Sequence, residues 1–219
     1  MKAEPDFVLA TNRVETLADG VFAIVMTLLI LEIRVPVVPR EAGSAVLGNA
    51  LLTLWPKFLC YLISFVTLGV YWVAHHLHFH SIRRADRVLF WINILFLMTV
   101  GLIPFSTALL GEHYRSPLAV SLYGIHMIAV SLVLQLHWSY ATGRRRLVSP
   151  DMPDDFVRTV THVILAGPAA YAVAVLLAWV SPWISLALYL LVNLIYILPG
   201  GAHLYLRRGM TSRPAEDRH

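Results

Sequence analysis

The stretch RVETLADGVFAIVMTLLILEI, residues 13–33, decides how the whole chain is interpreted. Its apolar centre runs from Gly20 to Leu31, and Asp19 and Glu32 stand directly on either side of it. A helix that faces lipid needs about 20 consecutive apolar residues to cross a bilayer. This segment is long enough to cross, but its ends are too polar to face lipid. It therefore predicts a membrane helix that lies inside an assembly.

The composition of the whole chain agrees with a membrane protein. The 219 residues are 58% hydrophobic and 14% charged, whereas a soluble domain carries about 25% charged residues. The single cysteine, Cys60, excludes an internal disulfide and leaves no cysteine-based metal or redox motif. The sequence thus favours an all-α, polytopic membrane protein.

Long apolar stretches predict six transmembrane helices in each subunit. The first is expected over residues 14–35, where Pro36 ends it, and the spans expected at 88–110 and 118–140 contain no charged residue. We expect residues 1–12 to form a cytoplasmic N-terminus, residues 13–206 the membrane domain, and residues 207–219 a disordered cytoplasmic tail. The five further spans are expected at residues 54–76, 88–110, 118–140, 159–180 and 183–206.

The basic residues indicate how the spans are oriented. With six spans, one side of the membrane would hold thirteen of the 17 lysines and arginines, and the other side would hold Arg34, Arg40, Lys57 and Arg115. Basic residues concentrate in cytoplasmic loops, so both termini are expected in the cytoplasm of a multi-pass cell-membrane protein. The positive net charge is then explained by topology, and no nucleic-acid partner is expected. The thirteen are Lys2, Arg13, Arg83, Arg84, Arg87, Arg144, Arg145, Arg146, Arg158, Arg207, Arg208, Arg213 and Arg218.

The two acidic residues of the first helix constrain its surroundings. Asp19 and Glu32 are 13 positions apart, which is about 20 Å along a helix, whereas the hydrocarbon core is about 30 Å thick. At least one of them therefore lies at membrane depth. A carboxylate facing lipid costs about 2.5–3.5 kcal/mol, so such groups usually face a bundle interior or water. We expect both to point toward protein or aqueous vestibules.

Aliphatic side chains recur on one face of this helix, at Ile24, Leu28, Leu31 and Val35, with Thr27 beside them. The stripe has two interpretations. It could pack against other helices of the same subunit. Alternatively, symmetry-related copies could meet on an axis, where the aliphatic residues would form a hydrophobic constriction with acidic rings at its mouths. Apolar constrictions gate by dewetting, and acidic rings attract cations.

The first helix also resembles that of a known family, the lysosomal potassium channels of the transmembrane protein 175 type. The resemblance extends over about residues 13–105, whereas spans four to six match only in length and hydropathy. The residues that carry it are Arg13, Leu17 to Ile24, Thr27, Leu28 and Leu31 to Ile33, followed by Ser64, Phe65, Trp72, His75, His76, Arg84, Asp86, Arg87, Asn93, Pro104 and Phe105.

The resemblance implies a function for each part of the first helix. The family's pore is lined by first helices instead of a backbone-carbonyl filter, and no TVGYG-like run occurs here. Single-repeat prokaryotic members are tetramers, so one repeat implies a homotetramer with potassium as the transported ligand and no cofactor. Ile24, Leu28 and Leu31 would form the constriction. Thr27 would supply hydroxyls near it and influence the preference for potassium over sodium.

A polar network around the first helix is implied as well. It would contain Arg13, Asp19 and Glu32, with Trp72 and His76 of the second span bonding to the first helix. Arg13 and Asp19 are six positions apart and so lie on different faces, which favours pairing of Arg13 with another helix or subunit. The family's usual Phe-Ser-Asp signature is replaced here by Leu17-Ala18-Asp19, so the hydrogen bond of that serine is missing.

Other polar residues give no sign of catalysis or metal binding. Four histidines crowd the end of the second span, but of these only His76 and His80 are four positions apart, and no cysteine or nearby carboxylate completes a metal set. His126, His137 and His162 are interpreted as packing residues, because no acidic partners in the middle of spans four to six would chain them into a proton relay. No paired carboxylates, nucleophile with its base, or phosphate loop occurs.

The sequence therefore predicts a passive, potassium-selective cation channel and not an enzyme. The alternative is a proton-coupled secondary transporter or another proton-conducting membrane protein. A carrier is disfavoured because the chain shows no inverted repeat and no pair of broken helices around a midplane site. A non-conducting scaffold is disfavoured because the first helix is so polar.

Overall fold

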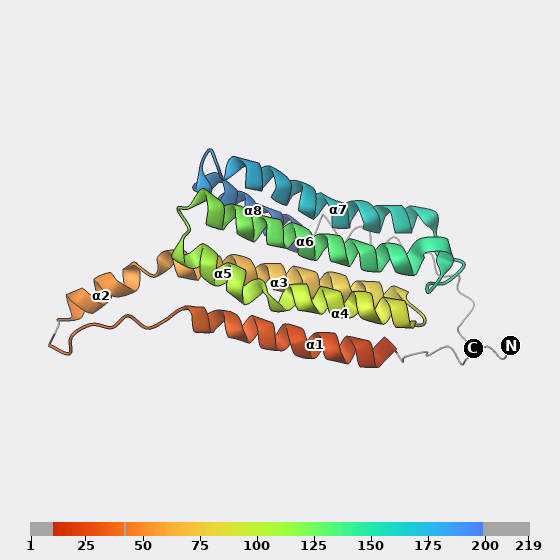
Figure 1. The fold of residues 1–219 in the computed structure, drawn as a ribbon, viewed down its shortest axis with the longest axis horizontal. Coiled ribbons are helices and arrows are strands. Elements are labelled where there is room, and N and C mark those ends of the chain that lie inside the picture. The colour runs from red at the N-terminus through yellow and green to blue at the C-terminus, as the bar shows by residue number, and fades with distance from the viewer. Residues whose placement is uncertain (1–10, 42, 199–219) are drawn as a thin grey trace.

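The computed structural model describes residues 11–41 and 43–198, and this part of the chain is almost entirely helical (Figure 1). Five helical stretches are long and apolar enough to cross a membrane, and a sixth, shorter one is apolar too. The predicted all-α membrane fold is thereby confirmed. The elements are α1 (Thr11–Leu28), η1 (Leu29–Glu32), α2 (Ser44–Leu52), α3 (Trp55–Ser81), α4 (Arg87–Gly101), α5 (Ile103–Glu112), α6 (Pro117–Thr142), η2 (Gly143–Arg145), α7 (Asp154–Leu177) and α8 (Pro182–Ile197).

The helices form a bundle in which α1 lies at one edge and α7 at the other (Figure 1). Helices α3, α4 and α5 lie beside α1, and α6 and α8 fill the space between them and α7. Because α1 packs against α3 and α4 on one side only, its opposite side is open in the single chain. This edge position decides which residues of α1 can meet another molecule.

The first helix ends earlier than the sequence suggested. It was expected to reach residue 35, but its last turn is a 3₁₀ segment, η1, and Ile33 is already extended, with φ −94° and ψ 90°. A residue before proline avoids the helical region, and a tightened 3₁₀ turn is a common way to end a helix. Val35 precedes Pro36 and therefore lies beyond the helix instead of on its stripe.

The third span is broken, although its sequence reads as one apolar run. Helix α4 ends at Gly101 and α5 starts at Ile103, with Pro104 in its first turn. Proline has no N–H and interrupts the helical hydrogen-bond ladder. The ring of His126 on α6 bridges the break, with Nε2 3.0 Å from the carbonyl oxygen of Thr99 and Nδ1 2.9 Å from Oγ of Ser106. A residue interpreted as simple packing thus forms hydrogen bonds to groups on both sides of the break.

Two further differences concern the ends of the spans. The segment 36–53 lies between the first two expected spans, yet it contains a helix, α2, none of whose residues is buried, because α2 projects away from the bundle (Figure 1). The expected last span, 183–206, is seen as α8 up to Ile197, and its remainder from residue 199 lies outside the described residues, as do residues 1–10 and the tail 207–219.

The loops after α3 and after α6 are clamped together at one end of the bundle. Ile82 and Val148 form an isolated antiparallel bridge, and the carboxylate of Asp86 caps α4 by accepting from the N–H of Leu89 at 2.8 Å. The other oxygen of Asp86 accepts a hydrogen bond of 2.7 Å from the hydroxyl of Tyr140. The arginine-rich loops are therefore anchored by specific bonds, and they lie at the end of the bundle where α1 starts (Figure 1).

Candidate functional site

Helix α1 has one face inside the subunit and one outside. The inner face, at intervals of three or four residues, is Val14, Ala18, Phe22, Val25 and Leu29, all at most 4% exposed. On the opposite face the exposed fraction is 61% for Ile24, 42% for Leu28 and 66% for Leu31. The aliphatic stripe therefore does not pack within its own subunit, which removes the first of its two interpretations.

Small and polar residues lie on the open face of α1 among the aliphatic ones. Gly20 lies one turn before Ile24, and a Cβ added there would have no neighbour within 4 Å. Thr27 is exposed beside Leu28, and Arg13 is exposed near the start of α1 and forms no salt bridge within the described part of the chain. A glycine, a threonine and an arginine on one face suit contact between helices or with water better than contact with lipid.

The hydroxyl of Thr27 has a defined direction. Its Oγ1 donates to the carbonyl oxygen of Ile24 at 2.8 Å and lies 3.0 Å from that of Ala23. A hydroxyl has a single hydrogen and two acceptor lone pairs. Because the helix backbone takes the hydrogen, the oxygen presents its lone pairs to the open side.

Asp19 is held by the second span. Nε1 of Trp72 donates a hydrogen bond of 2.8 Å to Oδ1 of Asp19, and the ring of His76 stacks on Trp72 with centroids 6.0 Å apart. The structure thus brings together three residues of the expected polar network. Within the described residues, the ring of His76 contacts the indole of Trp72, and its expected bond to the first helix stays a prediction.

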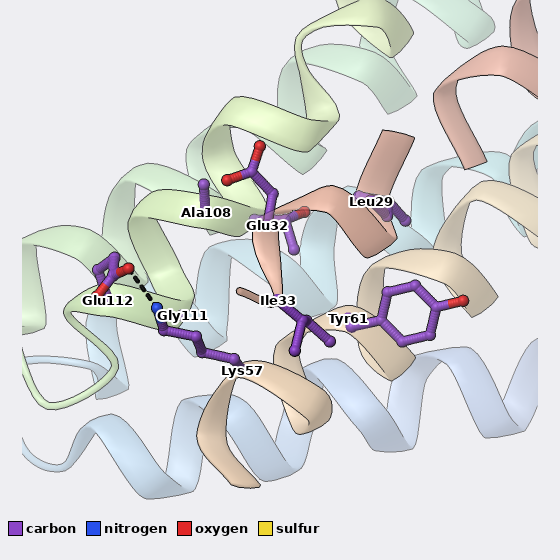
Figure 2. A pocket seen from close by; sticks show the side chains of 9 residues that line it. Leu29, Glu32, Ile33, Lys57, Tyr61, Ala108, Gly111 and Glu112 are labelled. Atoms are coloured by element: carbon purple, nitrogen blue, oxygen red, sulfur yellow. Dashed lines mark hydrogen bonds and ion pairs between the residues drawn. The ribbon is translucent and has the colours of Figure 1, made fainter. Parts of the chain in front are cut away.

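Glu32 lies at the other end of this helical stretch, beside a small cavity (Figure 2). The cavity has a volume of about 20 Å³, enough for one water molecule. Figure 2 shows that Lys57 and Glu112 form an ion pair beneath it while the carboxylate of Glu32 points away from that pair. Glu32 therefore lies at the rim of the bundle, toward the same end as α2 (Figure 1).

The five residues of the network thus have different surroundings. Asp19, Trp72 and His76 form one group at the α1–α3 contact. Arg13 and Glu32 do not join it and lie toward opposite ends of the helix. Within residues 11–41 and 43–198, no group of histidine, cysteine, aspartate and glutamate side chains is arranged to hold a metal ion.

Comparisons with known proteins give one consistent result. Residues 13–104 match the family model described as endosomal/lysosomal potassium channel TMEM175. The chain is 36% identical over 195 residues to a potassium channel of Chamaesiphon minutus, covering 88% of this chain and 96% of that protein. It is 41% identical over 114 residues to the human endosomal/lysosomal proton channel TMEM175, which is 50% of this chain and 23% of that protein.

A solved structure agrees with the sequence matches. The crystal structure of a lysosomal potassium-selective channel TMEM175 homolog from Chamaesiphon minutus superimposes with a TM-score of 0.75 at 36% sequence identity. The superposition covers 85% of this chain and 95% of that one. The likeness therefore extends over nearly the whole bundle, including spans four to six, for which the sequence showed only similar length and hydropathy.

Proposed function

The chain belongs to the TMEM175 family of potassium channels, and we propose that it conducts potassium passively through a pore formed by the α1 helices of four copies. The pore lies on the symmetry axis in the cell membrane, and both termini are cytoplasmic. The single observation that carries this proposal is the open face of α1, where Ile24, Leu28 and Leu31 are exposed while the opposite face packs into the bundle.

Copies of the chain are the best partner for this face. Lipid would cover an aliphatic stripe equally well, but it would leave Arg13 and Thr27 without polar surroundings. If four α1 helices surround a water-filled axis, Arg13 and Thr27 can contact water or ions. Gly20 can then lie close to the α1 helix of a neighbouring copy. The relatives support the same conclusion, because a potassium channel aligns along 88% of this chain.

The barrier to conduction is the aliphatic stripe. Four copies of Ile24, Leu28 and Leu31 facing an axis make rings without hydrogen-bonding groups, where water and ions pass only when the rings widen. Thr27 lies one position before Leu28 and offers its hydroxyl lone pairs to a partly dehydrated cation. Cation preference would then depend on the hydroxyls of Thr27, and opening on the separation of the α1 helices.

The Asp19–Trp72 bond connects the pore helix to the rest of the subunit. It joins α1 to α3 outside the apolar contact of the two helices. Movement of α3 against α1 would stretch or break this charge-assisted bond, which is stronger than a neutral one. We assign to Asp19, Trp72 and the stacked His76 the role of holding α1 in place.

A second function, proton conduction, has one observation in its favour. The vertebrate relatives that match half of this chain are named proton channels. A proton-coupled carrier would show saturable flux and a fixed stoichiometry, whereas a channel shows single-channel currents. Potassium conduction and proton conduction differ in another respect, which is the ion whose gradient sets the reversal potential.

The deciding experiment uses the purified full-length protein in liposomes. We expect potassium flux down its gradient, flux of sodium that is slower, and a particle mass that corresponds to four subunits. A reversal potential that follows the proton gradient would favour the second function instead. Coupled, saturable flux or a stable monomer with no flux would contradict the proposed channel.

A further inference from the structure

Two basic segments that are distant in sequence are joined at the end of the bundle where α1 starts (Figure 1). Arg84, in the loop after α3, donates through Nη2 to the carbonyl oxygen of Arg146, which is 62 positions away in the loop after α6, at 3.2 Å. The backbone N–H of Arg83 donates to the carbonyl oxygen of Leu147 at 2.9 Å. The arginine cluster, as we define it, consists of residues that are all exposed, namely Arg83, Arg84, Arg87, Arg144 and Arg146.

The cluster stands on a rigid base. The guanidinium of Arg146 lies over the ring of Tyr140, 4.7 Å from its centroid, and the hydroxyl of Tyr140 is bonded to Asp86. Because these contacts already hold the two loops together, a ligand would bind without first ordering them. Apolar residues of both loops and of α4 and α6 are buried together beneath the cluster, namely Ile82, Ala85, Leu89, Ala141, Leu147 and Val148.

The loop after α6 has an unusual backbone. Arg144 has φ 53° and ψ 28°, and Arg145 has φ 54°, both in the left-handed region. Glycine is the usual residue in this conformation after a helix, because it has no Cβ to clash. The turn is closed by the N–H of Leu147, which donates to the carbonyl oxygen of Ala141 at 3.1 Å. The side chain of Arg144 is thus presented at a conformational cost, which the topology of a membrane protein does not by itself require.

The charge of the cluster is not compensated within the described part of the chain. Arg145 forms a salt bridge with Asp154, and both carboxylate oxygens of Asp86 are already bonded elsewhere. Asp151 and Asp155 are exposed in the same region and form no salt bridge with the described arginines. A guanidinium is a planar fork of donors that matches the oxygens of a phosphate group. The cluster therefore suits an anionic phosphate ligand.

An apolar stripe on α4 begins beside the cluster. Directly after Arg87, the exposed fraction is 51% for Val88, 58% for Trp91, 38% for Leu95 and 59% for Met98. Ten residues of helix rise about 15 Å, which is half of the hydrocarbon thickness of about 30 Å. The stripe thus has the length of one lipid leaflet, and a tryptophan lies near its charged end, where amphipathic rings prefer the membrane interface.

We propose that the arginine cluster binds the phosphate of an anionic phospholipid, whose acyl chains lie along the α4 stripe. A soluble phosphate would use the arginines but leave the stripe uncovered. A zwitterionic lipid would bring its own cation close to several positive charges. The bound lipid would hold the loops after α3 and α6 together. Binding does not depend on the proposed conduction, and only the assignment to the cytoplasmic leaflet rests on the proposed orientation.

The fluorescence of Trp91 tests the proposal with the full-length protein in phosphatidylcholine vesicles. Bromine on an acyl chain quenches an indole that it touches, and the emission lost in Trp91→Phe isolates the signal of this residue. We expect brominated phosphatidylglycerol to quench Trp91 at a lower membrane fraction than brominated phosphatidylcholine does. Equal quenching by the two lipids would overturn the proposed site.

Two pairs of substitutions locate the headgroup. Arg83→Gln combined with Arg144→Gln should weaken the preference for phosphatidylglycerol by about fivefold for each arginine removed, the factor for one basic residue near an anionic membrane surface. Among the described residues neither side chain forms a hydrogen bond or salt bridge, so the fold should be kept. The control is Arg34→Gln combined with Arg40→Gln, exposed positions at the other end of the bundle, which should retain the preference. A preference that survives loss of Arg83 and Arg144 would contradict the site.

Arg144→Gly separates binding from a structural role. Glycine relaxes the left-handed backbone, so this variant should weaken lipid binding without lowering the temperature of thermal unfolding. An unchanged lipid preference in Arg144→Gly would exclude Arg144 from the headgroup site.

Other occupants of the cluster would give different results. Millimolar inorganic phosphate, compared with sodium chloride of equal ionic strength, should not reverse the quenching of Trp91. Its reversal would indicate a site for a soluble anion and contradict the lipid. If Arg83→Gln with Arg144→Gln instead loses the mass of the assembly and keeps the lipid preference, the cluster is a contact between subunits and the proposal is wrong.

Discussion

Trp72 and Asp19 form a direct hydrogen bond between the second and first spans, with the indole Nε1 2.8 Å from Oδ1 of the carboxylate. It is a side-chain bond between α1 and α3 in a contact that is otherwise apolar. Because α1 is at the edge of the bundle, this bond adds to the buried inner face of the helix in holding it in one orientation. Its loss should be visible in the dynamics of α1.

Trp72→Phe keeps an aromatic ring for His76 to stack on and removes the donor. A hydrogen bond to a charged group contributes about 1.5–3 kcal/mol, so we expect the amides of α1 around Asp19 to exchange with solvent at least about tenfold faster. Hydrogen–deuterium exchange by mass spectrometry measures this. Trp91→Phe, at an exposed position of α4, is the control, and equal exchange in both variants would show that the bond does not hold α1.

Leu28→Ala should increase potassium flux. Truncation widens the aliphatic ring and lowers its dehydration barrier, and a barrier lower by about 1.4 kcal/mol gives about a tenfold higher rate. Ile24→Asn should act in the same direction by giving the constriction a hydrogen-bonding group. Liposome flux or single-channel conductance measures both.

The matched control for the constriction is Ile30→Ala. Ile30 is 46% exposed but lies off the stripe, so its truncation should leave the flux unchanged. If Leu28→Ala behaves like Ile30→Ala, then the stripe does not line the ion path.

Thr27→Val should change the ratio of potassium to sodium permeability and should not stop conduction. The substitution conserves the shape of the side chain but removes the oxygen lone pairs that face the open side. Reversal potentials under mixed ionic conditions report the ratio. Thr27→Ser, which retains the hydroxyl, should restore the wild-type value, and an unaltered ratio in Thr27→Val would exclude Thr27 as an ion ligand.

The orientation of the chain is testable with single cysteines in a Cys60→Ser background, because Cys60 is buried. The asymmetry of basic residues predicts that Arg115→Cys reacts with an impermeant maleimide on intact cells. Arg144→Cys should react with the same maleimide only after the cells are permeabilised. The reverse pattern would place the termini outside the cytoplasm.

Gly124→Ala should destabilise the bundle by about 1–3 kcal/mol, the usual cost of overpacking a core. A Cβ at this position would overlap the hydroxyl of Tyr189 and a methyl group of Val175. That hydroxyl donates to the carbonyl of Val120 at 2.9 Å and is not free to move. Thermal unfolding in detergent measures the loss. Gly69→Ala, where a Cβ has no neighbour within 4 Å, should unfold at the wild-type temperature or above it, because alanine favours a helix more than glycine does.

Several features of the fold were predictable because hydropathy and helical period are local properties. The apolar runs predicted the membrane fold, and the spacing of Ile24, Leu28 and Leu31 predicted one aliphatic face. Ends of elements were less predictable. The 3₁₀ turn before Ile33, the small helix α2 and the break before Pro104 depend on which neighbours satisfy the local backbone.

The sequence by itself determined that this is a polytopic membrane protein whose first helix has an aliphatic face between two acidic residues, since composition and spacing need no tertiary contacts. Only the tertiary structure decided which face of α1 is open, because that depends on where α3 and α4 pack. It also decided that Trp72 meets Asp19 and that His137 meets His75 and His78. Residues on different helices become neighbours through helix packing. The spacing of residues along one helix carries no information about which residues of another helix they will contact.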